Sequence, residues 1–150
     1  MKVPIAKDFP DHHDAELVLK LYELRRETVM REARSFMLGA WWPKAFEDLA
    51  AIATFDHPDN AKFRQVTGYW ELAYGLAKHG IVHPEYLADS MGGEGFFVLA
   101  RVQPFLERFR TELAAPRFLR NTEWVATNTE TGKALFASIL ARTQQMIAIR

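Results

Sequence analysis

Residues 96–114 read FFVLARVQPFLERFRTELA and carry the clearest amphipathic pattern in the chain. The apolar side chains of this stretch fall on one helical face, namely Val98, Leu99, Val102, Phe105, Leu106, Phe109 and Leu113. The opposite face carries Arg101, Arg108 and Glu112. Apolar residues that recur every three or four positions are typical of an α-helix with one buried face. Pro104 points outward on a helical wheel, so we expect one helix with a bend over 96–114.

The same helical period recurs along the rest of the chain. Further helices are expected at 11–40, 44–54, 58–79, 85–90, 117–126 and 131–150. Pro43 and Pro58 suit the first turn of a helix, and Gly80 suits the position just after one. No stretch of five or more residues shows the alternation or the β-branched run of a strand. The sequence therefore predicts an all-α protein, a compact helical bundle of five to seven helices with no β-sheet.

Length and composition indicate one folded domain. The chain has 150 residues, of which 49% are hydrophobic and 25% are charged, and these fractions are close to the globular average. A chain of this length buries enough surface to fold without a disulfide or a metal. Residues 1–10 have no period and contain Pro4 and Pro10, so we expect an extended N-terminal arm there. Residues 11–150 are predicted to form a single helical domain.

Charge and cysteine content exclude several classes of protein. Nineteen basic and nineteen acidic residues give a formal net charge of zero, which argues against nucleic acid as a partner. The absence of cysteine excludes disulfides, thiolate zinc sites, iron–sulfur clusters and a cysteine nucleophile. No apolar run approaches the roughly 18 residues of a spanning helix, and the first residues do not resemble a signal peptide. We therefore expect a cytoplasmic protein without a membrane partner.

The residues best suited to chemistry do not form a recognisable motif. His79, His83 and Glu85 lie close in sequence but span a helix end, and neither H-E-x-x-H nor paired E-x-x-H motifs occur. The glycine-rich segment 92–95 contains an acidic residue and follows no strand, so an anion site is not expected. There is no G-x-S-x-G for a serine nucleophile. The sequence predicts no catalytic, cofactor-binding or metal-binding residues and no cofactor.

Small and aromatic residues suggest a protein interface instead. Ala61, Gly68 and Gly75 repeat every seven positions, and rows of small residues allow two helices to approach closely. Trp41 and Trp42 are neighbours at a helix end, where burying both indoles in a small monomer is difficult. These five residues are the candidate interface of a homodimer. The alternative is that the row meets a second one, Ala134, Ala141 and Ala148, within one chain.

Residues 68–87 read GYWELAYGLAKHGIVHPEYL and carry a family resemblance. A helix ends at Gly80, a short helix starts at Pro84-Glu85-Tyr86-Leu87, and an amphipathic helix then ends at Arg110. This pattern resembles a family of small bacterial all-helical domains of unknown function, and the resemblance covers residues 44–126. It implies a helical fold and supplies no catalytic residues.

Two functions are compatible with the sequence. The first is a soluble bacterial helical protein-interaction module without catalytic activity, whose partner is a second copy of itself or another protein. The alternative is a small helical enzyme or ligand-binding protein with a polar site near Glu71, His79, His83 and Arg101. A pocket with converging polar groups would favour the second function, and an exposed apolar patch would favour the first.

The homodimer is testable with one substitution on the small-residue row. Gly68→Leu should give a folded monomer on light scattering if Gly68 lies at a dimer face. It should unfold the chain by overpacking if the row packs within one chain. A wild-type protein that is monomeric at concentrations of tens of micromolar would contradict the dimer.

Overall fold

A computed structural model describes residues 8–150 of the protein. These residues form helices and no strand, which confirms the predicted all-α class. The α-helices are α1 His12–Arg25, α2 Thr28–Ser35, α3 Phe46–Ile52, α4 Asn60–Lys78, α5 Pro84–Met91, α6 Gly93–Val102, α7 Leu106–Glu112, α8 Arg120–Asn128 and α9 Glu130–Ala148. A π-helical turn, η1 Phe36–Ala40, follows α2, and a 3-10 turn, η2 Gln103–Phe105, lies between α6 and α7. The predicted arm at 1–10 lies mostly outside the described residues.

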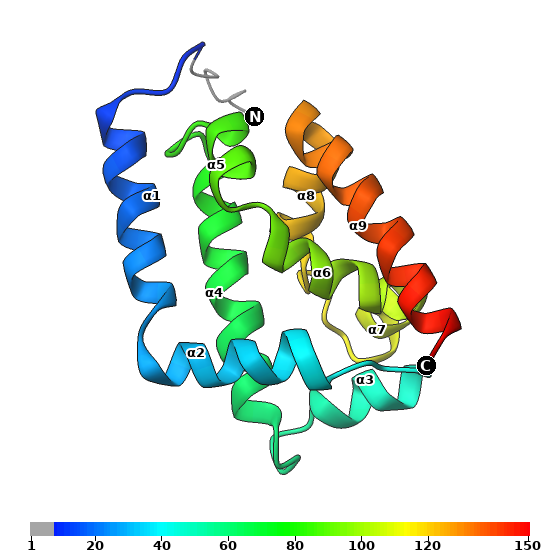
Figure 1. The fold of residues 1–150 in the computed structure, drawn as a ribbon. Helices are drawn as coiled ribbons and strands as arrows, with labels where there is room; N and C mark the ends of the chain where they lie inside the picture. Colours follow the sequence, from blue (N-terminus) through cyan, green and yellow to red (C-terminus); the bar gives the residue numbers. More distant parts are fainter. Residues whose placement is uncertain (1–7) are drawn as a thin grey trace.

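There are more helices than the five to seven predicted, because two of the predicted helices, 11–40 and 96–114, are divided. The predicted helix 11–40 stops at Arg25, and the Glu27 carboxylate starts α2 by accepting the backbone N–H groups of Val29 and Met30. In Figure 1, α2 turns sharply away from α1 at this point. The predicted helix 96–114 is interrupted at Pro104, which lacks the N–H that a continuous helix needs.

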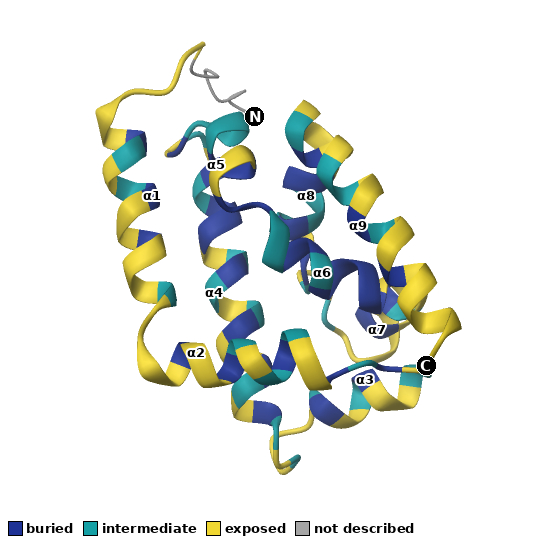
Figure 2. Cartoon of the chain, in the orientation of Figure 1, coloured by how far each residue is buried: buried dark blue, intermediate teal, exposed yellow. Residues whose placement is uncertain are grey.

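Helix α4 is the central element of the bundle. It contacts α2, α5, α6 and α8, and α9 packs in turn against α5, α6 and α8 (Figure 1). Figure 2 shows that buried residues recur along the length of α4, and the helix buries Phe63, Val66, Trp70, Ala73, Tyr74 and Ala77. Gly80 follows with a φ of 73°, as its predicted position after a helix requires.

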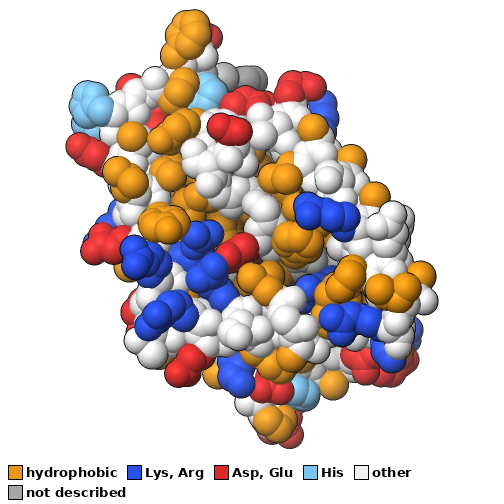
Figure 3. Space-filling model, viewed as in Figure 1, with side chains coloured by type: hydrophobic (Ala, Val, Ile, Leu, Met, Phe, Trp, Pro, Cys, Tyr) orange, Lys and Arg blue, Asp and Glu red, His pale blue; other side chains and the backbone are white. Residues whose placement is uncertain are grey.

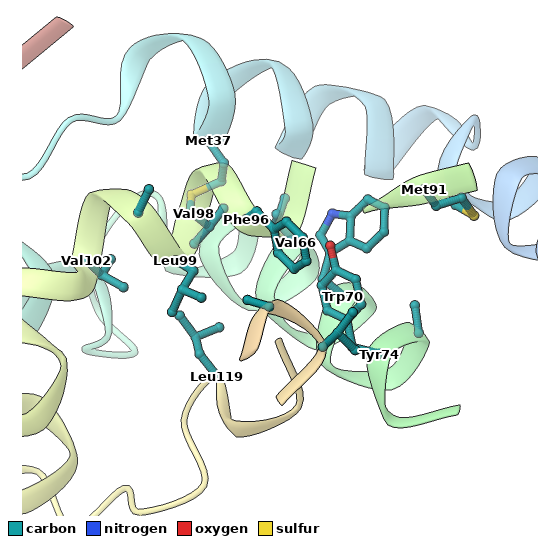
Figure 4. Packing of buried hydrophobic residues seen from close by; sticks show 14 of the residues in the cluster. Met37, Val66, Trp70, Tyr74, Met91, Phe96, Val98, Leu99, Val102 and Leu119 are labelled. Carbon is teal, nitrogen blue, oxygen red and sulfur yellow. The ribbon is translucent and has the colours of Figure 1, made fainter. Parts of the chain in front are cut away.

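An aromatic stack joins α4 to α6 in the middle of the core. The rings of Trp70 and Tyr74 are stacked with centroids 5.3 Å apart, and those of Tyr74 and Phe96 are 5.5 Å apart. Figure 4 shows Trp70, Tyr74 and Phe96 within the buried cluster. The Tyr74 hydroxyl donates to the carbonyl oxygen of Gly92 at 2.7 Å, and burial raises the pKa of Tyr74 well above its ordinary value. The prediction that Trp70 belongs to the core is confirmed, since it is 1% exposed.

The stack requires α6 to approach α4 very closely at Gly95. A Cβ atom at this position would lie 2.4 Å from Cε2 of the Tyr74 ring, which is closer than two carbon atoms can pack. Gly93 lies two residues earlier in the same helix, and a Cβ atom placed there would have no neighbouring atom within 4 Å. The two glycines of α6 therefore differ in their packing: the Tyr74 ring leaves no space for a side chain at Gly95, whereas Gly93 has space for one.

We predict that Gly95→Ala lowers the free energy of unfolding by about 1–3 kcal/mol, the usual effect of overpacking a core. Gly93→Ala is the matched control, and it should be neutral or slightly stabilising because alanine is the better helix former. Urea unfolding followed by circular dichroism measures both. Equal effects of the two substitutions would contradict the close approach to Tyr74.

Candidate functional site

The polar site considered as an alternative from the sequence is not assembled. Glu71 and His79 line one polar pocket of about 770 Å³, together with Lys78, Arg117 and Arg120. His83 lies at the start of α5, and the Arg101 guanidinium contacts the end of η1. The four predicted side chains therefore do not converge, because helices in different parts of the bundle carry them.

The Glu71 carboxylate is occupied by the start of α8. Its two oxygens accept the backbone N–H groups of Asn121 at 3.1 Å and Thr122 at 2.9 Å. The Thr122 hydroxyl donates to the same carboxylate at 2.7 Å. The first N–H groups of a helix have no partner within the helix, so a carboxylate placed there stabilises it. Glu71 thus fixes α8 against α4 and is not free for acid–base chemistry.

His83 and Glu85 also act on helix starts. The His83 side chain accepts the backbone N–H of Tyr86 in α5, and the His83 backbone N–H donates to the buried Asp14 carboxylate at 2.9 Å. Glu85 accepts the backbone N–H groups of Glu130 at 2.5 Å and Thr131 at 3.0 Å, at the start of α9. Partial burial alone would raise the pKa of Glu85, but the hydrogen bonds from Thr131 and Glu130 outweigh it and lower this pKa.

Neither a metal cluster nor a membrane span is found in the described part of the chain. Within residues 8–150, no three histidine, aspartate or glutamate side chains are grouped so that they could hold a metal ion. No helix among the same residues is both long and apolar enough to cross a membrane.

The predicted interface residues divide into buried and exposed members. Trp41 is buried against the edge of Phe63, with ring centroids 5.9 Å apart. Gly75 is buried too, and a Cβ there would lie 2.9 Å from the side-chain nitrogen of Asn121. These two positions lie in the interior of the single chain. Ala61 and Gly68 are exposed, and Trp42 is partly exposed.

The partly exposed Trp42 lies between two pockets that we call the Trp42 groove. The pockets have volumes of about 490 and 500 Å³, and both are lined by Trp42, Arg101 and Arg150. The remaining residues of the first pocket are Pro43, Lys44, Pro104, Phe105 and Ile147. The second pocket adds Leu38, Gly39, Phe97, Arg142, Thr143, Gln145, Met146 and Ile149. The groove is therefore apolar with basic side chains, and no acidic residue lines it.

Arg101 holds the backbone at one wall of the groove. Its guanidinium donates to the carbonyl oxygens of Met37 at 2.5 Å, Leu38 at 2.6 Å and Trp41 at 3.0 Å. Met37 and Leu38 belong to η1 and Trp41 directly follows it, and the last carbonyls of a helix lack internal partners and carry partial negative charge. Among the described residues, no carboxylate side chain forms an ion pair or a hydrogen bond with Arg101. Burial, together with the charge of Arg150, lowers the pKa of Arg101 to about 10.

The Trp42 ring is fixed by its surroundings. Its indole N–H donates to the Gly39 carbonyl oxygen at 3.0 Å. The guanidinium carbon of Arg101 lies 3.8 Å from the ring centre, and that of Arg150 lies 4.3 Å away, both within the range of cation–π attraction. The sequence pointed to Trp42 but not to its partners. The sequence signal that could have indicated these partners is the group of apolar and basic residues at 142–150, at the end of the last predicted helix.

The fold and the groove together define an all-helical domain with one basic, apolar groove between η1 and the end of α9. The chain belongs to the family described as Domain of unknown function (DUF4760), whose profile matches residues 10–129. This match confirms the predicted resemblance to a family of unknown function. No curated protein and no solved structure matches the chain. The matched residues include Trp42 and Arg101, whereas α9 follows them.

We predict that Glu85→Gln destabilises the protein near neutral pH by about 1 kcal/mol, the usual contribution of a helix N-terminal cap. Because folding lowers the pKa of Glu85, the wild-type carboxylate stabilises the fold above its unfolded pKa of about 4.5. This contribution is lost as the pH falls through the lower folded pKa. The difference in unfolding free energy between wild type and Glu85→Gln should therefore shrink towards about pH 3.

Urea unfolding at several pH values measures this difference. Glu130→Gln is the matched control, because Glu130 is an exposed acid at the same helix end that pairs only with Lys133. A pH-independent difference for Glu85→Gln would show that the carboxylate does not act through its charge.

Proposed function

We propose that the protein is a non-catalytic protein-interaction module and that the Trp42 groove is its docking surface. One observation carries this proposal: a partly exposed tryptophan, fixed by two guanidinium groups, lies between two apolar pockets. Tryptophan and arginine side chains contribute most often to the central contacts of protein interfaces. Pockets of this size accept the side chains of a bound segment.

Exposed apolar side chains next to the groove support the proposal. Met146 and Ile147 in the last turn of α9 are 38% and 47% exposed, and Ile149, which directly follows α9, is 80% exposed. Figure 3 shows hydrophobic and basic side chains side by side over this end of α9. A group of exposed apolar residues around a concave site is typical of a surface that another molecule covers.

The arrangement of ionisable groups favours binding over catalysis. Glu71, His83 and Glu85 hold helix starts, and Arg101 holds a helix end. The polar pocket at Glu71 and His79 therefore has its carboxylate committed to backbone N–H groups. No aspartate, glutamate or histidine side chain that could transfer a proton is among the described residues that line the Trp42 groove.

Self-association through α4 is a separate proposal that rests on Ala61 and Gly68. A Cβ at Gly68 would have no atom within 4 Å, so Gly68→Leu does not overpack the monomer. A loss of dimer in that variant would therefore report on the interface alone.

We further propose a bacterial cytoplasmic location, in line with the family resemblance and the absence of cysteine.

A displayed library of random peptides selected on the wild-type protein tests the docking surface. Selected peptides should lose at least about thirtyfold in affinity for Trp42→Ala, as expected for a central interface residue. Phe55→Ala is the matched control, because Phe55 is an exposed aromatic ring with the Arg64 guanidinium 5.1 Å from its centre but lines neither pocket of the Trp42 groove. Peptides that bind both variants equally, or a failure to select any peptide, would refute the proposal. Circular dichroism of both variants serves as the control that each of them is folded.

A further inference from the structure

We infer that the segment bound by the Trp42 groove is acidic, with carboxylates that pair with Lys44, Arg142 and Arg150 beside its apolar side chains. This inference rests on the proposed function and adds the chemistry of the partner. Its first basis is charge complementarity. Four basic residues and no acidic residue line the groove, in a chain whose formal net charge is zero.

The basic residues of the groove also have no ion pair within residues 8–150. Among the ion pairs of residues 8–150, none includes Lys44, Arg101, Arg142 or Arg150. Elsewhere the pattern is different, since Arg25, Arg34 and Arg110 all have carboxylate partners. The groove therefore keeps a local positive charge that a bound carboxylate can neutralise.

Arg101 strengthens this field from inside the protein. It is 4% exposed, and its hydrogen bonds go to backbone carbonyls, which orient the guanidinium without neutralising its charge. A buried charge is less screened than one in water, so it acts on the groove at longer range. Arg101 is thus a positioning residue, and the exposed Arg142, Arg150 and Lys44 are the groups that can reach a ligand.

Thr143 supplies a second, independent indication of a ligand. Thr143 lines the second pocket and is 1% exposed, and its buried hydroxyl has no hydrogen-bond partner among the described residues. Buried hydroxyl groups are normally hydrogen-bonded, because leaving one unpaired costs free energy. A peptide in the pocket would offer the missing partner through its backbone or a polar side chain.

The shape of the groove favours a peptide over an anionic membrane. Apolar and basic side chains together also attract membrane surfaces, but membrane-binding proteins insert protruding apolar groups between lipids. Here the central residues Trp42 and Arg101 line concave pockets, into which individual side chains of a peptide fit.

The composition of the selected peptides tests the inference. Peptides that require Trp42 should be enriched in aspartate and glutamate next to aliphatic or aromatic residues, relative to the unselected library. Replacing these acids by their amides should weaken binding about tenfold, and raising the salt concentration should weaken the acidic peptides more than the amide versions. Trp42-dependent peptides without any acidic excess would overturn the inference and leave the proposed function intact.

Charge variants of the protein supply the complementary test. The triple variant Lys44→Gln, Arg142→Gln and Arg150→Gln should lose about tenfold in affinity for the acidic peptide and little for its amide version. The control Lys20→Gln, Arg31→Gln and Arg117→Gln removes the same charge from exposed positions outside the groove and should leave both affinities unchanged. Equal losses in the two triple variants would show that net charge alone acts, which overturns the specific pairing.

Thr143→Val tests the buried hydroxyl with a readout that a structural role would not give. Removing an unpaired hydroxyl should leave stability unchanged or raise it, while peptide affinity falls severalfold.

Sedimentation with vesicles of phosphatidylserine and phosphatidylcholine tests whether an anionic membrane, and not a peptide, occupies the Trp42 groove. Trp42-dependent binding to these vesicles without selection of any peptide would replace the peptide by a membrane and overturn both proposals.

Discussion

The structure depends on satisfying the free backbone groups at the ends of its many short helices. A helix of seven to ten residues has more unpaired end groups than internal hydrogen bonds, so it is marginal on its own. In this protein, charged side chains from other helices supply the missing partners. Glu71 holds the start of α8, Glu85 holds the start of α9, and Arg101 holds the end of η1. Each contact fixes one helix against another as well as capping it.

This use of charge explains why the residues that looked chemically active in the sequence are structural. Carboxylates and a histidine that lie near one another along the chain go to different helix ends. Glu94 behaves in the same way, because it binds the guanidinium groups of Arg25 and Arg34 and so joins α6 to α1 and α2. Figure 3 shows the basic side chains gathered over the junction of α1 and α2. An acidic residue in the glycine-rich segment 92–95 thus has a packing role.

The Trp42 groove is the place where this balancing of charge is incomplete. Arg101 is paired with carbonyl oxygens, and within residues 8–150 neither it nor the neighbouring basic side chains form an ion pair with a carboxylate. The same guanidinium that completes η1 therefore leaves a positive, apolar groove at the surface. Structure and proposed binding are coupled through Arg101, since the cap on η1 also positions Trp42.

The sequence by itself determined the helical class, the core role of Trp70 and the helix end at Gly80, because these follow from local periodicity and backbone preference. It also pointed to the pair Trp41 and Trp42 as indoles that are difficult to bury together, without deciding which of the two is exposed. Only the tertiary structure decided that Trp41 and Gly75 are buried, that Glu71 and Arg101 lie apart, and that the end of α9 meets η1 beside Trp42. The physical reason is that periodicity is set within one helix. Burial and helix capping depend on side chains that arrive from distant parts of the chain.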